Sequence, residues 1–155
     1  MAQATQSELA HGSAMALLDP KTDSLKVSRD REIRFLAASM VREGRLLEAD
    51  RLTREALEKS PLSEEILAIR SLVLEVRQDW TEARQTLQRL LAVQGDSAPV
   101  ETWCHWVRVL RCEGLAERAL DETVKGLIQF PGHPTLVSEL EALQNRSQPT
   151  PQMTA

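Results

Sequence analysis

Small residues recur at a nearly constant spacing in this chain. Ala49, Ala83 and Ala119 are separated by 34 and 36 residues, and each lies in a leucine-rich, charged segment. Where two helices cross at about 8 to 10 Å, a small side chain on one helix accepts a large side chain from the other. Internal repeats of this period are typical of stacked helical hairpins. The spacing therefore predicts an all-α chain built from three successive hairpins.

Helical periodicity and turn residues agree with this prediction. Apolar residues recur every three to four positions at Ile33, Leu36, Met40, Leu46, Leu52 and Leu57, and no segment alternates like a strand. Turns within the hairpins are predicted at Gly44, at Gly114, and before a capping box formed by Asp79 and Glu82. Pro61, the loop 95–99 and the loop 131–134 are predicted to separate one hairpin from the next.

These positions resemble the tetratricopeptide repeat (TPR) family, whose 34-residue repeat has large, small and proline positions at set places. The first unit matches at Ile33, Leu36, Ala37, Met40, Gly44, Ala49, Ala56 and Pro61, and the third at Trp103, Trp106, Leu110, Gly114, Ala119, Gly126 and Pro131. The second unit departs at Arg70, Leu90 and Gly95, and the third has Val107 at a small position. The resemblance implies a right-handed superhelical stack.

The domain organisation follows from these boundaries. We expect repeats at about 30–63, 64–98 and 100–133 and a capping helix at 134–146, which together form a TPR-like domain over 28–146. Residues 1–27 are expected to form a flexible or short-helical arm, with a helix over 7–18 that Pro20 ends. Residues 147–155 contain two prolines and few apolar groups, and we expect a disordered tail.

Composition narrows the function classes. The chain has 155 residues, of which 42% are apolar and 27% charged, and its formal net charge is −4. Non-specific binding to nucleic acid or to an anionic membrane needs a concentrated basic field, which this mixed charge pattern lacks. The first 20 residues have no Lys or Arg ahead of an apolar core, and no run reaches the roughly 18 apolar residues of a membrane span. We expect no nucleic-acid partner, no membrane insertion and a cytoplasmic location.

An enzymatic function receives little support from the residues. Cys104, His105 and Cys112 lie close in sequence, and a Cys–His pair can supply a nucleophile and a base. On one helix, however, His105 points about 100° away from Cys104, and no further metal-ligand spacing is present. We expect reduced cysteines, tryptophans that pack in the core, and no catalysis, metal or cofactor. A thiol enzyme remains the alternative, and it predicts fast alkylation of Cys104 at neutral pH.

In the TPR family the first helix of each hairpin lines a concave groove that holds a peptide or helix of a partner protein. Carried over by position, the resemblance implies a peptide-binding groove of Arg31, Arg34, Ala38, Val41, Glu65, Ala68, Leu72, Glu75, Glu101, Cys104, Arg108 and Arg111. Apolar positions flanked by arginines suit a segment with apolar anchors and some acidic groups.

The leading hypothesis is therefore a non-catalytic adaptor or chaperone. In size and layout the chain is also similar to the small chaperones of type III secretion systems, although it has no tyrosine where their grooves are rich in aromatic residues. The alternative is a structural subunit that docks into a larger multiprotein assembly through its arm or convex face. The residues leave open whether two copies associate.

Overall fold

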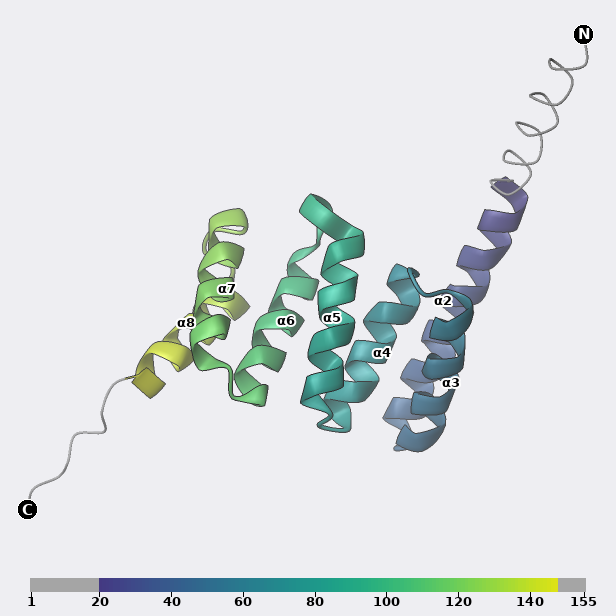
Figure 1. Cartoon of the computed structure of the whole chain (residues 1–155), viewed down its shortest axis with the longest axis horizontal. Helices are drawn as coiled ribbons and strands as arrows, with labels where there is room; N and C mark the ends of the chain where they lie inside the picture. Colours follow the sequence, from purple (N-terminus) through teal and green to yellow (C-terminus); the bar gives the residue numbers. More distant parts are fainter. Residues whose placement is uncertain (1–19, 148–155) are drawn as a thin grey trace, which may run out of the picture.

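The computed structural model describes residues 20–147, and every regular element in that range is a helix (Figure 1). The elements are α2 (Pro20–Arg42), α3 (Leu46–Lys59), α4 (Glu64–Val76), α5 (Trp80–Gln94), the short 3-10 helix η1 (Gly95–Ser97), α6 (Val100–Glu113), α7 (Ala116–Gln129) and α8 (Pro134–Ser147). Three hairpins, α2/α3, α4/α5 and α6/α7, follow one another, and α8 packs on both helices of the last one. This arrangement confirms the predicted all-α stack of TPR-like hairpins with a terminal helix.

One turn geometry closes all three hairpins. The amides of Arg45, Asp79 and Leu115 donate to the carbonyls of Met40, Leu74 and Leu110 at 2.8, 2.9 and 2.9 Å. This bond spans five residues, and the residue before each donor has a positive φ: 77° at Gly44, 62° at Gln78 and 93° at Gly114. Both features define the Schellman motif, in which a left-handed residue ends the helix.

The second hairpin therefore ends its first helix with Gln78 in a conformation that glycine adopts more readily. The capping box predicted there is absent, because the Asp79 side chain makes no capping hydrogen bond. Asp79 instead lies 3.7 Å from Arg77, and Glu82 lies 3.4 Å from Arg70.

The first helix extends beyond the expected start of the repeat domain. Helix α2 begins at Pro20 and continues without a break through residue 28, where we placed the boundary between the arm and the repeats. Proline is well suited to the first turn of a helix, where its missing N–H has no partner to lose, and Asp23 adds an acidic group to that turn. The helix predicted over 7–18 and the tail 148–155 lie outside the described residues.

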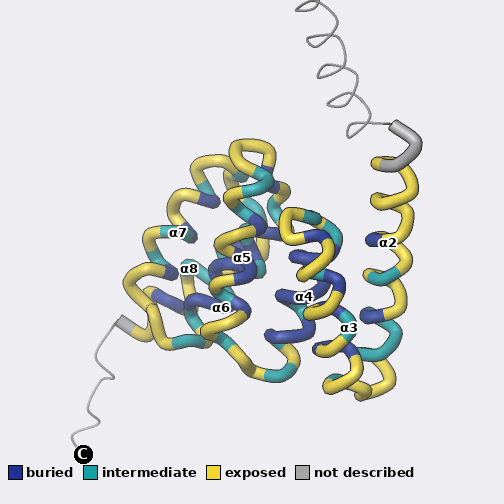
Figure 2. The backbone as a smooth tube through the Cα atoms, turned by 45° about the vertical axis from the view of Figure 1, so that its right-hand side comes forward, coloured by how far each residue is buried: buried dark blue, intermediate teal, exposed yellow. Residues whose placement is uncertain are grey.

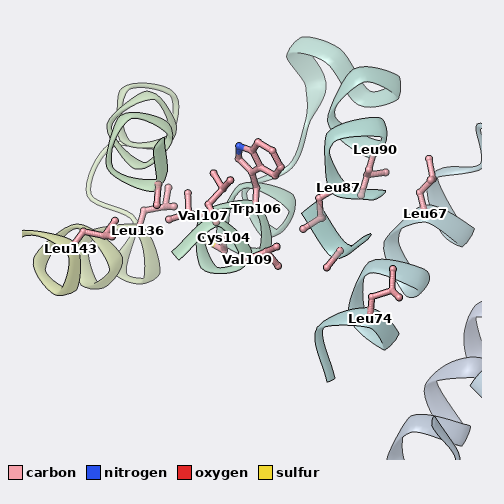
Figure 3. Close-up of a cluster of buried hydrophobic side chains, with 13 residues drawn as sticks. Leu67, Leu74, Leu87, Leu90, Cys104, Trp106, Val107, Val109, Leu136 and Leu143 are labelled. Atoms are coloured by element: carbon pink, nitrogen blue, oxygen red, sulfur yellow. The ribbon is translucent and has the colours of Figure 1, made fainter. Parts of the chain in front are cut away.

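The core confirms the small-residue positions. Ala49, Ala83 and Ala119 are fully buried, each on the second helix of a hairpin. Ala83 and Ala119 belong to a cluster of apolar side chains that extends from α4 to α8 and includes Leu67, Leu87, Trp106 and Leu136 (Figure 3). Trp80 and Trp103 pack against this cluster, as predicted.

The first hairpin is less covered than the other two. Ile33 and Met40 are only half-buried and Leu36 is 48% exposed, although their spacing is typical of the buried stripe of an amphipathic helix. The described residues place no hairpin before α2, so the face that later units bury against a neighbour is open here. Figure 2 shows α2 mostly exposed along its length, in contrast to the buried inner faces of α4 to α8.

A buried ionic cluster joins the first hairpin to the second. Asp50 of α3 accepts hydrogen bonds from Arg70 of α4 at 3.0 Å and from Arg54 at 2.8 Å, and it lies 2.8 Å from Arg77. Arg70 also donates to the Thr53 hydroxyl at 3.1 Å. Arg70, which departs from the leucine usual at its repeat position, is therefore buried opposite a carboxylate that the first hairpin supplies.

Candidate functional site

A cavity of about 580 Å³ lies across the first helices of the three hairpins. We refer to it as the groove. Its floor is apolar, with Ala38 from α2 and Ala68, Ile69 and Leu72 from α4. Its remaining lining residues are Arg34, Glu64, Glu65, Ser71, Leu87, Leu90, Gln94, Pro99, Glu101, Thr102 and His105. The volume lies within the range of roughly 300 to 1,000 Å³ typical of ligand pockets.

The groove brings together six of the twelve residues inferred from the resemblance. Arg34, Ala38, Glu65, Ala68, Leu72 and Glu101 line it. Val41, Glu75, Arg108 and Arg111 lie on later turns of the same helices and do not line it, and Cys104 is buried. Arg31 lines a separate depression formed by residues of α2 alone. On α4 and α6 the cavity thus reaches only the earlier turns, and Leu87, Leu90 and Gln94 of α5 complete its lining.

Ion pairs connect the first helix of each unit to the first helix of the next. Arg34 of α2 lies 2.6 Å from Glu65 of α4, and Arg108 of α6 donates to Glu75 of α4. Between α6 and α8, Arg111 binds Glu139 through two hydrogen bonds, at 2.6 and 3.1 Å. The hydrogen bonds to Glu75 and Glu139 raise the pKa of Arg108 and Arg111, respectively. These bridges tie together the helices that form the groove.

Three of the arginines expected in the groove are paired within the chain. The resemblance implied that they could face acidic groups of a partner, and Arg34, Arg108 and Arg111 each also have a carboxylate partner in the chain itself. The partners lie 31, 33 and 28 residues away in sequence, close to one repeat. Such pairs join positions that only the stacking of hairpins brings together.

His105 and Gln94 are groove residues that the sequence analysis missed. His105 Nδ1 lies 3.6 Å from Glu75 Oε2. Burial lowers the pKa of His105, against the opposing effect of Glu75, so the imidazole is neutral at neutral pH. The buried Gln94 Oε1 has no hydrogen-bond partner among the described residues. The repeat register offered a signal for His105, because it occupies the same position as Ile69 of the second unit.

The candidate nucleophile is not activated. Cys104 is buried, and this burial raises the pKa of its thiol. A protonated thiol is a poor nucleophile. Its neighbour is His133 rather than His105, with Cys104 Sγ 4.0 Å from His133 Nδ1. Cys112 is exposed, and both cysteines are free thiols, as predicted.

Within residues 20–147 no three His, Cys, Asp or Glu side chains cluster in a way that could hold a metal ion. None of the helices in the same range combines the length and apolar character needed to cross a membrane.

Comparison with known proteins gives a match in structure alone. No protein-family model matches the sequence, and no curated protein matches it. The second TPR domain of human RPAP3, in complex with the HSP70 peptide SGPTIEEVD, has a TM-score of 0.66 and 14% identity, covering 76% of this chain and 98% of that chain.

Two further solved structures are similar. The TPR domain of Arabidopsis OM64 has a TM-score of 0.67 and 11% identity, covering 78% of this chain and 98% of that chain. The Yersinia enterocolitica type III secretion chaperone SycD, in complex with a peptide of the translocator YopD, has a TM-score of 0.64 and 12% identity, covering 76% and 93%. Together with the repeated turns and buried alanines, these similarities show that the chain has the fold of a tetratricopeptide repeat domain.

Proposed function

We propose that this chain is a non-catalytic interaction module, an adaptor or chaperone, that holds a peptide or helical segment of a partner protein in the groove. The observation that carries the proposal is the cavity itself, which crosses α2, α4 and α6 and combines an apolar floor with a polar rim. Apolar anchors on an extended or helical segment bind in such grooves, and polar contacts at the rim fix their register. We place this activity in the cytoplasm.

Solved proteins of the same fold support this proposal. RPAP3 binds an HSP70 peptide and SycD binds a YopD peptide. The ion pairs between α2, α4, α6 and α8 favour a groove whose walls are held in place before a partner arrives, and such preorganisation lowers the entropic cost of binding. The buried, protonated Cys104 thiol gives a catalytic alternative no support.

To test this proposal, peptides that bind the purified protein are selected from a displayed random library. The affinity of the selected peptides is then measured for a variant in which a large side chain fills the groove. Ala68→Phe adds a large side chain to the groove floor, and we expect it to weaken the selected peptides by about ten-fold or more. Ala92→Phe is the matched control, because Ala92 is exposed on α5 and does not line the groove. Selected peptides that bind Ala68→Phe as tightly as the unmodified protein would contradict the proposal.

A second candidate function is that of a structural subunit in a larger assembly. It is favoured by exposed apolar side chains on the first hairpin, among them Phe35 on α2 and Leu47 on α3, which are 69% and 73% exposed. Native mass spectrometry of the protein purified with its partners separates the two candidates. An assembly lost in Phe35→Asp but kept in Ala68→Phe supports the structural subunit, and the reverse result supports the groove.

A further inference from the structure

The charges that line the groove do not balance. Its charged residues are Arg34 and the three carboxylates of Glu64, Glu65 and Glu101. Arg34 is paired with Glu65 at 2.6 Å, so these two charges offset each other. Glu64 and Glu101 are exposed, and neither forms an ion pair within residues 20–147. Two unpaired carboxylates therefore remain, one on α4 and one on α6.

No cation within the groove offsets them. His105 is neutral at neutral pH because burial lowers its pKa. Arg108 and Arg111 of α6, which the resemblance placed in the groove, lie outside the cavity and are paired with Glu75 and Glu139. An acidic segment entering the groove would meet two like charges with no free cation opposite them.

We infer that the groove binds a segment in which an apolar anchor is flanked by lysine or arginine, and that it rejects acidic segments. The anchor contacts the floor of Ala38, Ala68 and Leu72, and the flanking cations lie against Glu64 and Glu101. The RPAP3 domain, by contrast, binds the acidic peptide SGPTIEEVD. The inference rests on the proposed function, because it names the chemistry of the partner at the same groove.

The test uses three peptides that differ only in charge: SGPTIKKVK, SGPTIQQVN and SGPTIEEVD, all amidated at the C-terminus. Fluorescence anisotropy at low and at physiological salt measures their affinity for the full chain. We expect the lysine peptide to bind about ten-fold more tightly than the acidic one, with the neutral peptide between them. This difference shrinks as salt rises, because the carboxylates are exposed.

Matched variants assign the effect to the groove. Glu64→Gln combined with Glu101→Gln should remove most of the preference for the lysine peptide, whereas Glu117→Gln combined with Glu141→Gln should leave it unchanged. Glu117 on α7 and Glu141 on α8 are also exposed but do not line the groove. A preference that persists in the groove variant would mean that the overall charge of the protein causes it, and this would overturn the inference.

The outcomes separate this inference from the proposed function. The charge preference is wrong if the acidic peptide binds as tightly as the lysine peptide. It is also wrong if none of the three peptides binds. In either case the groove proposal stands as long as Ala68→Phe weakens the binding of library peptides. If no library peptide depends on Ala68, the groove proposal itself fails.

Discussion

At the residue scale, alanine sets the distance between paired helices. Ala49, Ala83 and Ala119 have no exposed surface, and Ala83 and Ala119 lie within the main apolar cluster. A core at this packing density has no room for added methyl groups unless the backbone moves.

We therefore expect Ala49→Leu and Ala83→Leu each to lower the free energy of unfolding by about 1 to 3 kcal/mol. Urea denaturation followed by circular dichroism measures the change. Ala92→Leu introduces the same side chain at an exposed site of α5 and should change stability by less than about 0.5 kcal/mol. Equal effects at buried and exposed sites would contradict the packing assignment.

Removing the carboxylate of the buried ionic cluster should destabilise the protein more than removing Arg70 does. Asp50→Ala leaves Arg70 buried without its main partner, since the Arg70 side chain is only 7% exposed, and we expect a loss of about 3 kcal/mol. Arg70→Leu leaves Asp50 bound to Arg54 and Arg77, so its cost should be about 1 kcal/mol or less. In the double variant much of the loss from Asp50→Ala should be recovered. A double variant as unstable as Asp50→Ala alone would show that burial of unpaired Arg70 is not the cause.

The same cluster predicts a dependence on pH. Burial opposes ionisation of Asp50, but the hydrogen bond from Arg70 and the charges of Arg70, Arg54 and Arg77 outweigh it and lower the pKa below the ordinary 3.8. The unfolded state therefore takes up the proton first, and this stabilisation is present above pH 3.8 and lost as pH falls through the folded pKa. The stability difference between the unmodified protein and Asp50→Asn should be largest at neutral pH and should shrink once the pH is taken below 3.8. Urea denaturation at both pH values measures it, and a constant difference would contradict the pairing.

At the element scale, each hairpin depends on one left-handed residue after its first helix. Glycine adopts this conformation at Gly44 and Gly114, and Gln78 adopts it in the second hairpin. Nothing lies within 4 Å of the point where a side chain would begin at Gly44 or Gly114, so backbone conformation rather than space accounts for glycine there.

We expect Gln78→Gly to raise the free energy of unfolding by about 0.5 to 1 kcal/mol, because it relieves a strained φ and keeps the hydrogen bond from Asp79 to Leu74. The reverse change, Gly114→Gln, should lower it by about 1 kcal/mol. Gln85→Gly, on the exposed surface of α5, is the control and should lower stability by about 1 kcal/mol. Thermal denaturation of the three variants decides between the predictions, and a loss of stability in Gln78→Gly would refute the strain argument.

At the scale of the whole molecule, the stack is not uniform. The main apolar cluster extends from α4 to α8, and the first hairpin joins the second through Asp50, Arg70 and Thr53 as well as through apolar contacts. In a stack of repeats each unit is stabilised mainly by its neighbours. A unit that contacts a neighbouring hairpin on one side only, as the first hairpin does within residues 20–147, therefore opens most easily.

Hydrogen exchange measured by mass spectrometry should show this difference. We expect amides of α2 and α3 to exchange at least about ten-fold faster than those of α4 and α6, because opening the first hairpin exposes less apolar surface. Addition of a groove peptide should slow exchange in α2, since Arg34 and Ala38 line the groove. Equal protection in all three hairpins would show that the stack unfolds as one cooperative unit.

Local physics made the fold predictable from sequence. The 34-residue spacing of buried alanines, the glycines with positive φ and the three-to-four-residue periodicity each depend on residues close in the chain. The apolar part of the groove came from the resemblance to the TPR family, which placed Ala38, Ala68 and Leu72 on the first helices, and all three line the cavity. Proline suits the first turn of a helix as well as the region after one, so Pro20 alone did not indicate that α2 begins there.

The charge of the groove was decided by tertiary structure alone. Whether an arginine is free or paired depends on which carboxylate the next hairpin brings within reach, and that depends on how successive hairpins are rotated and displaced. Arg34, Arg108 and Arg111 find partners about one repeat away, while Glu64 and Glu101 find none among the described residues. A repeated pattern of apolar and small residues specifies that hairpins stack. The pattern does not specify which exposed side chains of neighbouring hairpins come into contact, because that depends on their distances in the folded structure.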